Sequence, residues 1–156
     1  MNHLSGTDRF LRLVLTAVYQ LLKASWFVRR PRTFGAHALA LTPERKLVLV
    51  KLRYAPGWRL PGGGRKRREE AVDAALRELH EEIGMTAHGA VQLAAEMEQR
   101  PDKRRDLASV VVVRDVHYAP RWSFEVEQIR EVDLQCLPPD MAPVARAWID
   151  AVLPDL

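Results

Sequence analysis

The spacing of apolar and polar residues predicts strands through the middle of the chain and helices on either side of them. Short apolar runs, typical of buried strands, occur at residues 34–41, 47–50, 91–97, 107–118 and 129–134. Apolar residues recur at helical spacing over residues 69–83, where Gly84 ends the stretch, and over residues 138–154. Residues 54–64 hold two prolines and four glycines and are predicted to form a loop. This order of elements predicts an α/β fold, in which helices cover a mixed β-sheet on two sides.

A further amphipathic helix is predicted near the N-terminus, over residues 10–28. Its polar residues follow steps of three and four and form one narrow stripe, made by Arg9, Arg12, Thr16, Gln20 and Lys23. Only ten residues separate Arg12 from Lys23, about 15 Å of helix against roughly 30 Å of hydrocarbon. This helix is therefore not expected to span a membrane.

Two roles are open for the N-terminal helix. In the first, it packs on the domain or on a second copy of the chain, as in a homodimer, and buries the apolar residues Leu13, Leu15, Val18, Leu22 and Trp26. In the second, it lies on a membrane surface, with Trp26 and Phe27 at the interface and the arginines of residues 29–32 near lipid phosphates.

Composition and charge narrow the class of protein. The 156 residues, 47% hydrophobic and 28% charged, suit one folded domain, expected at residues 33–156 after a helix and basic linker at residues 1–32. The single cysteine, Cys136, excludes an internal disulfide and a thiolate metal site, and it fits a reducing, cytoplasmic location. The net charge of +4 is concentrated in basic runs at residues 29–32, 65–68 and 100–105, which indicate an anionic partner unless they are only solvated loops.

Three carboxylates share one face of the helix predicted at residues 69–83. Glu78, Glu81 and Glu82 fall within about 100° of one another on the helical wheel. Such like charges destabilise a helix by roughly 0.2–0.5 kcal/mol per pair, and near its C-terminus they also oppose the macrodipole. Local stability does not explain the cluster, whereas a hard cation such as Mg²⁺ does, because it binds carboxylate oxygens together with substrate phosphates.

The segment before this helix is suited to a phosphate ligand. Glycines at residues 62–64 let backbone approach a ligand closely, and the segment leads towards a helix N-terminus, where anions are favoured. Arg59, Lys51 and Arg53 lie just upstream and are candidates for binding phosphate oxygens. Together with the carboxylates, these residues predict metal-assisted attack of water on phosphorus.

At these residues the sequence resembles the Nudix hydrolase family. The family's box reads Gly, five residues, Glu, seven residues, Arg-Glu-apolar-x-Glu-Glu-x-Gly-apolar, and it is matched at all nine specified positions from Gly63 through Glu69 and Arg77 to Met85. The resemblance implies an α/β/α sandwich with a mixed sheet. It also implies hydrolysis of a diphosphate bond in a nucleoside diphosphate linked to another group, with Mg²⁺ or Mn²⁺ as cofactor.

The resemblance also implies roles for individual residues. Glu78 and Glu82 would be the main metal ligands. Glu81 would be a further ligand or the base that activates water, and Gly62 would add its backbone carbonyl. Glu69 and Arg77 would orient the side chains around this metal centre.

Two features depart from the common family pattern. The turn at residues 64–68 is strongly basic, which is either a harmless loop or a reason to expect a more anionic substrate, such as RNA or a long polyphosphate. Some relatives supply a further catalytic acid from a later loop, and the candidates here are Asp102, Glu125 and Glu127.

Other functions and other side chains stay open. The domain is alternatively a catalytically silent module that binds a nucleotide or RNA, or a membrane-surface hydrolase of a lipid-linked diphosphate. Four aromatic residues either stack on a base or pack in the fold: Tyr54, Trp58, Trp122 and Phe124. The histidines show no common ligand spacing and are expected in core or surface roles.

Overall fold

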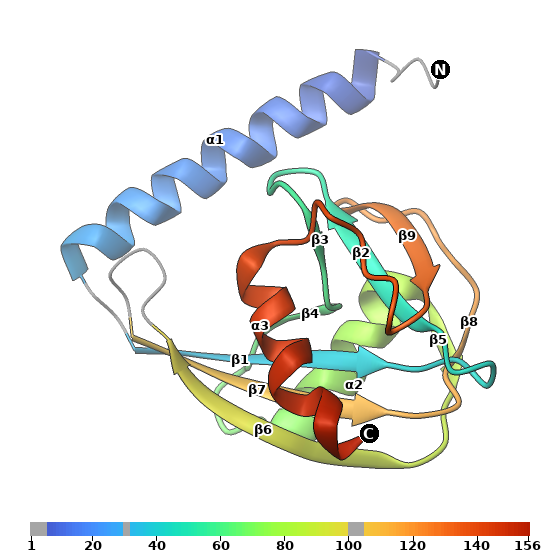
Figure 1. The fold of residues 1–156 in the computed structure, drawn as a ribbon. Helices are drawn as coiled ribbons and strands as arrows, with labels where there is room; N and C mark the ends of the chain where they lie inside the picture. Colours follow the sequence, from blue (N-terminus) through green and yellow to red (C-terminus); the bar gives the residue numbers. More distant parts are fainter. Residues whose placement is uncertain (1–5, 30–31, 100–104) are drawn as a thin grey trace.

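The computed structural model describes residues 6–29, 32–99 and 105–156, and the chain folds as a layered α/β structure (Figure 1). Its elements in chain order are α1 (Gly6–Arg29), β1 (Arg32–Ala40), β2 (Leu47–Leu52), β3 (Trp58–Arg59), β4 (Gly62–Gly64), α2 (Ala71–Ile83), β5 (Met85–Ala87), β6 (Val91–Gln99), β7 (Arg105–Val113), β8 (His117–Tyr118), β9 (Val126–Val132), α3 (Pro143–Val152) and a 3₁₀ turn (Leu153–Asp155).

The strands form a mixed sheet and two smaller antiparallel sheets. The largest sheet has the order β4-β1-β7-β6, and β1 and β7 within it run parallel while its other pairs are antiparallel. The remaining strands pair in the orders β3-β2-β9 and β5-β8. In Figure 1 the large sheet lies between α2 and α3, which confirms the expected α/β sandwich.

Alternation along the strands divides the interior into two cores. Ala36, Ala38 and Ala40 of β1 face α2, whereas Leu39 and Leu41 point to the opposite side, towards α3. β7 alternates in the same way, so the two central strands of the large sheet are buried on both faces, and β2 of the neighbouring sheet shows the same alternation. This double burial explains why the strands read as nearly continuous apolar runs.

The segment at residues 54–64 corrects the prediction of a plain loop. It contains β3 and β4, and the glycines of β4 pair antiparallel with residues 35–37 of β1. Glycines have no side chains to show the alternation of a strand, so this pairing left no pattern in the sequence.

Other boundaries also differ from the predicted ones. The stretch predicted at residues 107–118 is two strands, because the chain turns at Asp115, whose φ is 52°. The last helix begins at Pro143 rather than at residue 138. The residues between lie against β3, where Trp58 donates a backbone hydrogen bond to Asp140 (3.0 Å).

The helix α1 presents most of its described apolar residues to solvent, although Leu15 is half-buried. Leu13, Val18 and Leu22 are 70, 48 and 46% exposed, so the expectation that they pack against the domain is wrong. Burial against a second copy or contact with a membrane surface remains a prediction. No helix in the described part of the chain is both long and apolar enough to span a lipid bilayer. The side chains of residues 23–30, and with them Trp26 and Phe27, lie outside the described residues.

Candidate active site

The helix α2 positions the carboxylates that the sequence singled out. It ends at Gly84, whose φ of 71° is left-handed and whose N–H donates to the Leu79 carbonyl. Glu78 and Glu82 stand one turn apart, with Glu78 half-buried and Glu82 only 7% exposed. Glu81 points further outward, and its side chain is 54% exposed.

The glycine strand β4 lies directly against these carboxylates. The Gly62 N–H donates to Glu82 Oε2 at 2.9 Å. A Cβ on Gly63 would stand 2.7 Å from Glu78 Oε1, so only glycine leaves room for that carboxylate. The glycines therefore lie beside the C-terminal half of α2, and not at its N-terminus as the sequence suggested. The reason is the pairing of β4 with β1, which aligns Gly62 with His37.

Arg77 connects the outer carboxylates to one another. Its Nε and Nη2 donate to the two Glu69 oxygens at 2.8 and 3.0 Å, a bidentate pair. Its Nη1 donates to Glu78 at 2.7 Å and more weakly to Glu81 at 3.3 Å, and its Nη2 also reaches the Gly64 carbonyl at 3.0 Å. Hydrogen bonds from Arg77, and then from the Lys66 backbone, lower the pKa of Glu69 to about 2. Glu69 and Arg77 thus hold Glu78 and β4 in place.

Burial makes the inner carboxylates difficult to ionise. It raises the pKa of Glu82 to about 8, despite the hydrogen bond from Gly62, and the charges of Glu78, Glu125 and Glu81 add to the effect. Burial also raises the pKa of Glu78, although Arg77 opposes the shift. Ionised together, these groups form a concentrated negative charge that a cation would neutralise.

The structure separates the three candidates for a downstream acid. Glu125 accepts a hydrogen bond from the Tyr54 hydroxyl at 3.2 Å, and its charge acts on both Glu78 and Glu82. Glu127 is instead paired with Arg12 of α1 at 2.7 Å. Asp102 lies outside the described residues. Of the two candidates that the structure describes, Glu125 is the one beside the cluster.

Glu78, Glu81 and Glu82 offer carboxylate oxygens, which are the ligands that a hard divalent cation prefers. One of these carboxylates, Glu82, is buried and has a raised pKa. Among the residues that the structure describes, no three histidine, cysteine or acidic side chains already converge on one point. Glu78 accepts a hydrogen bond from Arg77, and Glu81 turns outward, so the carboxylates are not gathered around one point as the structure stands.

A pocket of about 530 Å³ opens beside the cluster, within the roughly 300–1,000 Å³ typical of small-molecule sites. Glu82, the glycines 62–64, Arg59 and Arg65 line its polar side. Lys51 and Arg53, the other basic residues expected to bind phosphate, do not line the pocket. Lys51 Nζ lies 5.8 Å from the centroid of the Trp58 ring, and the Arg53 carbonyl accepts a hydrogen bond from Arg12 Nε at 3.2 Å.

Several pocket residues were not anticipated from the sequence. Tyr19 of α1, Phe34 and Trp148 line it, as does His37, whose ring stacks on Trp148 with centroids 4.0 Å apart. Burial, followed by the charge of Arg59, lowers the pKa of His37 to about 3. No local pattern distinguishes these residues from ordinary core positions.

The four aromatic residues considered for stacking lie in different environments. Tyr54 lines the pocket, and Trp58 is buried in the core beneath α3. Trp122 and Phe124 are exposed and pack edge-on against each other, with centroids 4.3 Å apart. Only Tyr54 of this set is placed to meet a ligand in the pocket.

Comparison with known protein families matches the NUDIX domain to residues 31–152. The chain belongs to the NUDIX family. The matched NUDIX region leaves almost all of α1 outside it, so this helix is an addition to the shared domain.

Similar proteins agree with this NUDIX assignment. A Bacillus subtilis (strain 168) protein, named as a candidate 8-oxo-dGTP diphosphatase, is 39% identical over 69 residues, or 44% of this chain and 45% of that protein. The match therefore spans less than half the length of that relative.

Two solved structures share the fold. A MutT NUDIX hydrolase from Burkholderia pseudomallei is 24% identical with a TM-score of 0.67, covering 78% of this chain and 98% of that one. A MutT protein from Methanosarcina mazei Go1 is 20% identical with a TM-score of 0.70, covering 81% of this chain and 96% of that one.

Proposed function

We propose that this NUDIX protein is a metal-dependent hydrolase that cleaves a phosphoanhydride bond in a nucleoside diphosphate linked to another group. The observation that carries the proposal is the buried Glu82 carboxylate, held by the Gly62 N–H at 2.9 Å beside Glu78, at the edge of a pocket that also presents Arg59 and Arg65. Family membership and the name of the Bacillus relative support a nucleotide substrate.

Glu78 and Glu82 would hold Mg²⁺ or Mn²⁺, with Glu81 and the Gly62 carbonyl as further ligands. When bound, the cation supplies charge neutralisation at the phosphates and lowers the pKa of a coordinated water. Glu125, which acts electrostatically on both main ligands, is the downstream acid best placed to assist.

The remaining residues would bind and orient the substrate. The Arg59 Nε is buried and has no hydrogen-bond partner among the described residues, which suits a phosphate oxygen. Arg65 is fixed by two hydrogen bonds to the Glu69 carbonyl, at 3.0 and 2.8 Å, and so presents its charge at the pocket with little loss of freedom. The more exposed Glu81 is available to accept the proton of the attacking water.

A release assay tests the proposal with nucleoside triphosphates, oxidised nucleotides, ADP-ribose, dinucleoside polyphosphates, NADH, capped RNA and prenyl diphosphates, each with and without Mg²⁺. The Glu78→Gln variant should lose more than about 100-fold in kcat, because it keeps the size of the side chain and removes the ligand charge. Glu98→Gln, on exposed β6, is the matched control and should behave as wild type. Mg²⁺-dependent turnover in Glu78→Gln at the wild-type rate would refute the proposal, and binding without any product would indicate the silent module.

The exposed apolar side of α1 favours a second candidate, a hydrolase that reaches a lipid-linked diphosphate at a membrane surface. Flotation with anionic liposomes tests it on the full chain. The Leu13→Ser/Leu21→Ser variant should lose any binding that depends on this surface, because both side chains are exposed there. Equal behaviour of variant and wild type would exclude the membrane role, and concentration-dependent dimerisation lost in the variant would indicate a second copy as the partner instead.

A further inference from the structure

The pocket beside the carboxylates is lined in part by a helix that the NUDIX match does not include. Tyr19, in the third quarter of α1, lines the pocket together with Tyr54, Phe34 and Leu60. The NUDIX match begins at residue 31, so this contact belongs to the chain's own N-terminal addition.

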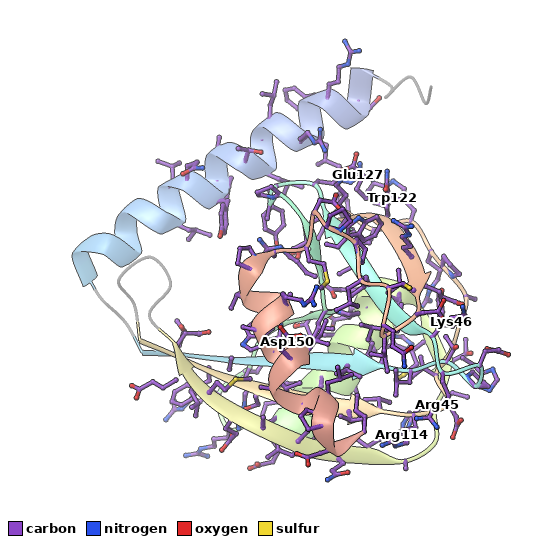
Figure 2. The ribbon with its side chains drawn as sticks, viewed as in Figure 1. Arg45, Lys46, Arg114, Trp122, Glu127 and Asp150 are labelled. Carbon is purple, nitrogen blue, oxygen red and sulfur yellow. The ribbon has the colours of Figure 1, made fainter. Side chains whose placement is uncertain are left out.

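Polar contacts fix α1 beside the pocket. Arg12 Nη2 forms an ion pair with Glu127 Oε2 at 2.7 Å, and Arg12 Nε donates to the Arg53 carbonyl at 3.2 Å. The Glu127 side chain is 11% exposed and that of Arg12 is 46% exposed, so solvent screens this pair in part. Figure 2 shows Glu127 on the side of the domain that faces α1. Tyr19 stands seven residues after Arg12, which is close to two helical turns and therefore on the same face.

Apolar burial alone does not explain the orientation of α1. A helix that docked to stabilise the fold would turn its apolar stripe inward. Here Arg12 and Tyr19 contact the domain, and Leu15 is half-buried beside them, whereas Leu13 and Leu21 are about 70% exposed. The hydrogen bond, the ion pair and the ring contact that join α1 to the domain are thus made by polar and aromatic groups, and one of these groups, Tyr19, lines the pocket.

The Tyr19 ring extends an aromatic wall that reaches the carboxylates. Its centroid lies 5.2 Å from that of Tyr54, with the two rings tilted by 39°. At its other end the Tyr54 hydroxyl donates to Glu125 at 3.2 Å, and Glu125 acts electrostatically on Glu82. A series of contacts therefore leads from Tyr19 through Tyr54 to Glu125, beside the proposed reaction centre.

We propose that α1 completes the substrate pocket and that Tyr19, with Tyr54, forms the surface on which the planar base of a nucleotide substrate lies. Aromatic rings bind bases through stacking, whatever the base, and a chain of phosphates alone gains nothing from such a surface. Tyr19 is then a specificity-determining residue that separates base-bearing substrates from simple polyphosphates. The inference rests on the proposed phosphoanhydride hydrolase function.

Steady-state kinetics on the full-length protein test this role. With dGTP and ADP-ribose as substrates, Tyr19→Ala should raise KM by about tenfold while kcat changes by less than about twofold. Inorganic tripolyphosphate, used as a competitive inhibitor, should keep its wild-type inhibition constant because it has no base. Tyr19→Phe should restore the wild-type KM, because it keeps the ring.

Two further variants separate the pocket role from a structural one. Leu22→Ala, on the outward side of α1, should leave KM unchanged. Arg12→Glu should raise the nucleotide KM, and the exchanged pair Arg12→Glu/Glu127→Arg should recover part of the loss by restoring the ion pair. A Tyr19→Ala variant with the wild-type melting temperature and an unchanged nucleotide KM would overturn the inference.

The same variants remain informative if the hydrolase proposal fails. If no substrate is turned over, the dissociation constant of the nonhydrolysable α,β-methylene analogue of dGTP replaces KM, read from tryptophan fluorescence, since Trp148 lines the pocket. Weaker binding in Tyr19→Ala but not in Leu22→Ala would then support the role of Tyr19 while the hydrolase function is refuted. Equal binding in all variants would refute the role of Tyr19.

Discussion

Replacing Gly63 with alanine should displace the Glu78 carboxylate without changing any charge. The new Cβ would stand 2.7 Å from Glu78 Oε1 and 2.9 Å from Cδ, whereas ordinary contact begins near 3.4 Å. The carboxylate would have to retreat by about 0.7 Å, because β4 is fixed by its pairing with β1. This retreat also disturbs the 2.7 Å hydrogen bond between Glu78 and Arg77.

The Gly63→Ala variant should lose activity but keep nearly all of its folding stability. A misplacement of about 1 Å at a reacting centre costs roughly 100-fold, so Gly63→Ala should lose about 10- to 100-fold in kcat/KM, or about 1.4 to 2.7 kcal/mol. Gly63 is not among the glycines with positive φ, so alanine adopts its backbone conformation without strain. The free energy of unfolding should therefore change by less than about 1 kcal/mol.

The neighbouring glycines provide matched controls for this experiment. A Cβ on Gly64 meets nothing within 4 Å, so Gly64→Ala should keep wild-type activity and stability. Gly62 has a φ of 150° and its Cβ would stand 2.3 Å from the Ala36 carbonyl, so Gly62→Ala should unfold at a much lower temperature. Activity measured at saturating Mg²⁺, together with urea denaturation, separates the three variants. The reasoning is refuted if Gly63→Ala retains full activity, or if Gly64→Ala loses as much.

Four further predictions follow from the same site. Changing residues 65–68 to serine should raise KM more than it lowers kcat, and an unchanged KM would show that the basic turn does not contact substrate. The pKa of His37 is about 3 in the folded chain and near 6.5 when unfolded, so its stabilising contribution is complete above pH 6.5 and is lost as the pH falls. Between pH 7 and 4, the His37→Phe variant should therefore lose less free energy of unfolding than wild type, as measured by urea denaturation. Parallel pH curves for the two proteins would contradict this. Glu125→Gln should lower activity and the apparent Mg²⁺ affinity by about tenfold, with Glu98→Gln unchanged in the same titration. Glu82→Gln should abolish turnover yet melt at a higher temperature than wild type in EDTA at pH 8, and a lower melting temperature would contradict the assigned cost of burying that charge.

Much of the carboxylate site could be predicted from the sequence because it lies within one continuous segment. The apolar stripe that ends in Leu79 and Ile83 fixes which face of α2 is buried, and this placement fixes the direction of Glu78 and Glu82. Gly84 marked the end of the helix because only glycine readily adopts its left-handed conformation. Local spacing was sufficient for these residues.

The rest of the site depends on contacts between distant segments. The parallel pairing of β1 with β7 joins residues about 70 positions apart, and no local pattern sets that register. The choice of Glu125 over Glu127 depends on the ion pair between Glu127 and Arg12, which lie 115 residues apart. Alternation could not have indicated it, since both glutamates occupy polar positions near the start of β9.

The helix α1 was predicted correctly, but the prediction that its apolar residues pack against the domain was wrong. An amphipathic pattern identifies the apolar and the polar side of a helix. It predicts which side faces the domain only when burial of apolar residues within the same chain determines how the helix packs. On α1, an ion pair at Arg12 and a ring contact at Tyr19 hold the side that carries these two residues against the domain. Glu82 is a parallel case, since a buried carboxylate whose pKa rises to about 8 weakens the ligand-free fold. Each arrangement is unfavourable for folding alone, and the two share one pocket. A divalent cation would offset the cost at Glu82, whereas the exposed apolar residues of α1 do not line the pocket and require a separate partner. The carboxylate cluster therefore fits the proposed hydrolase function better than a role in structural stability.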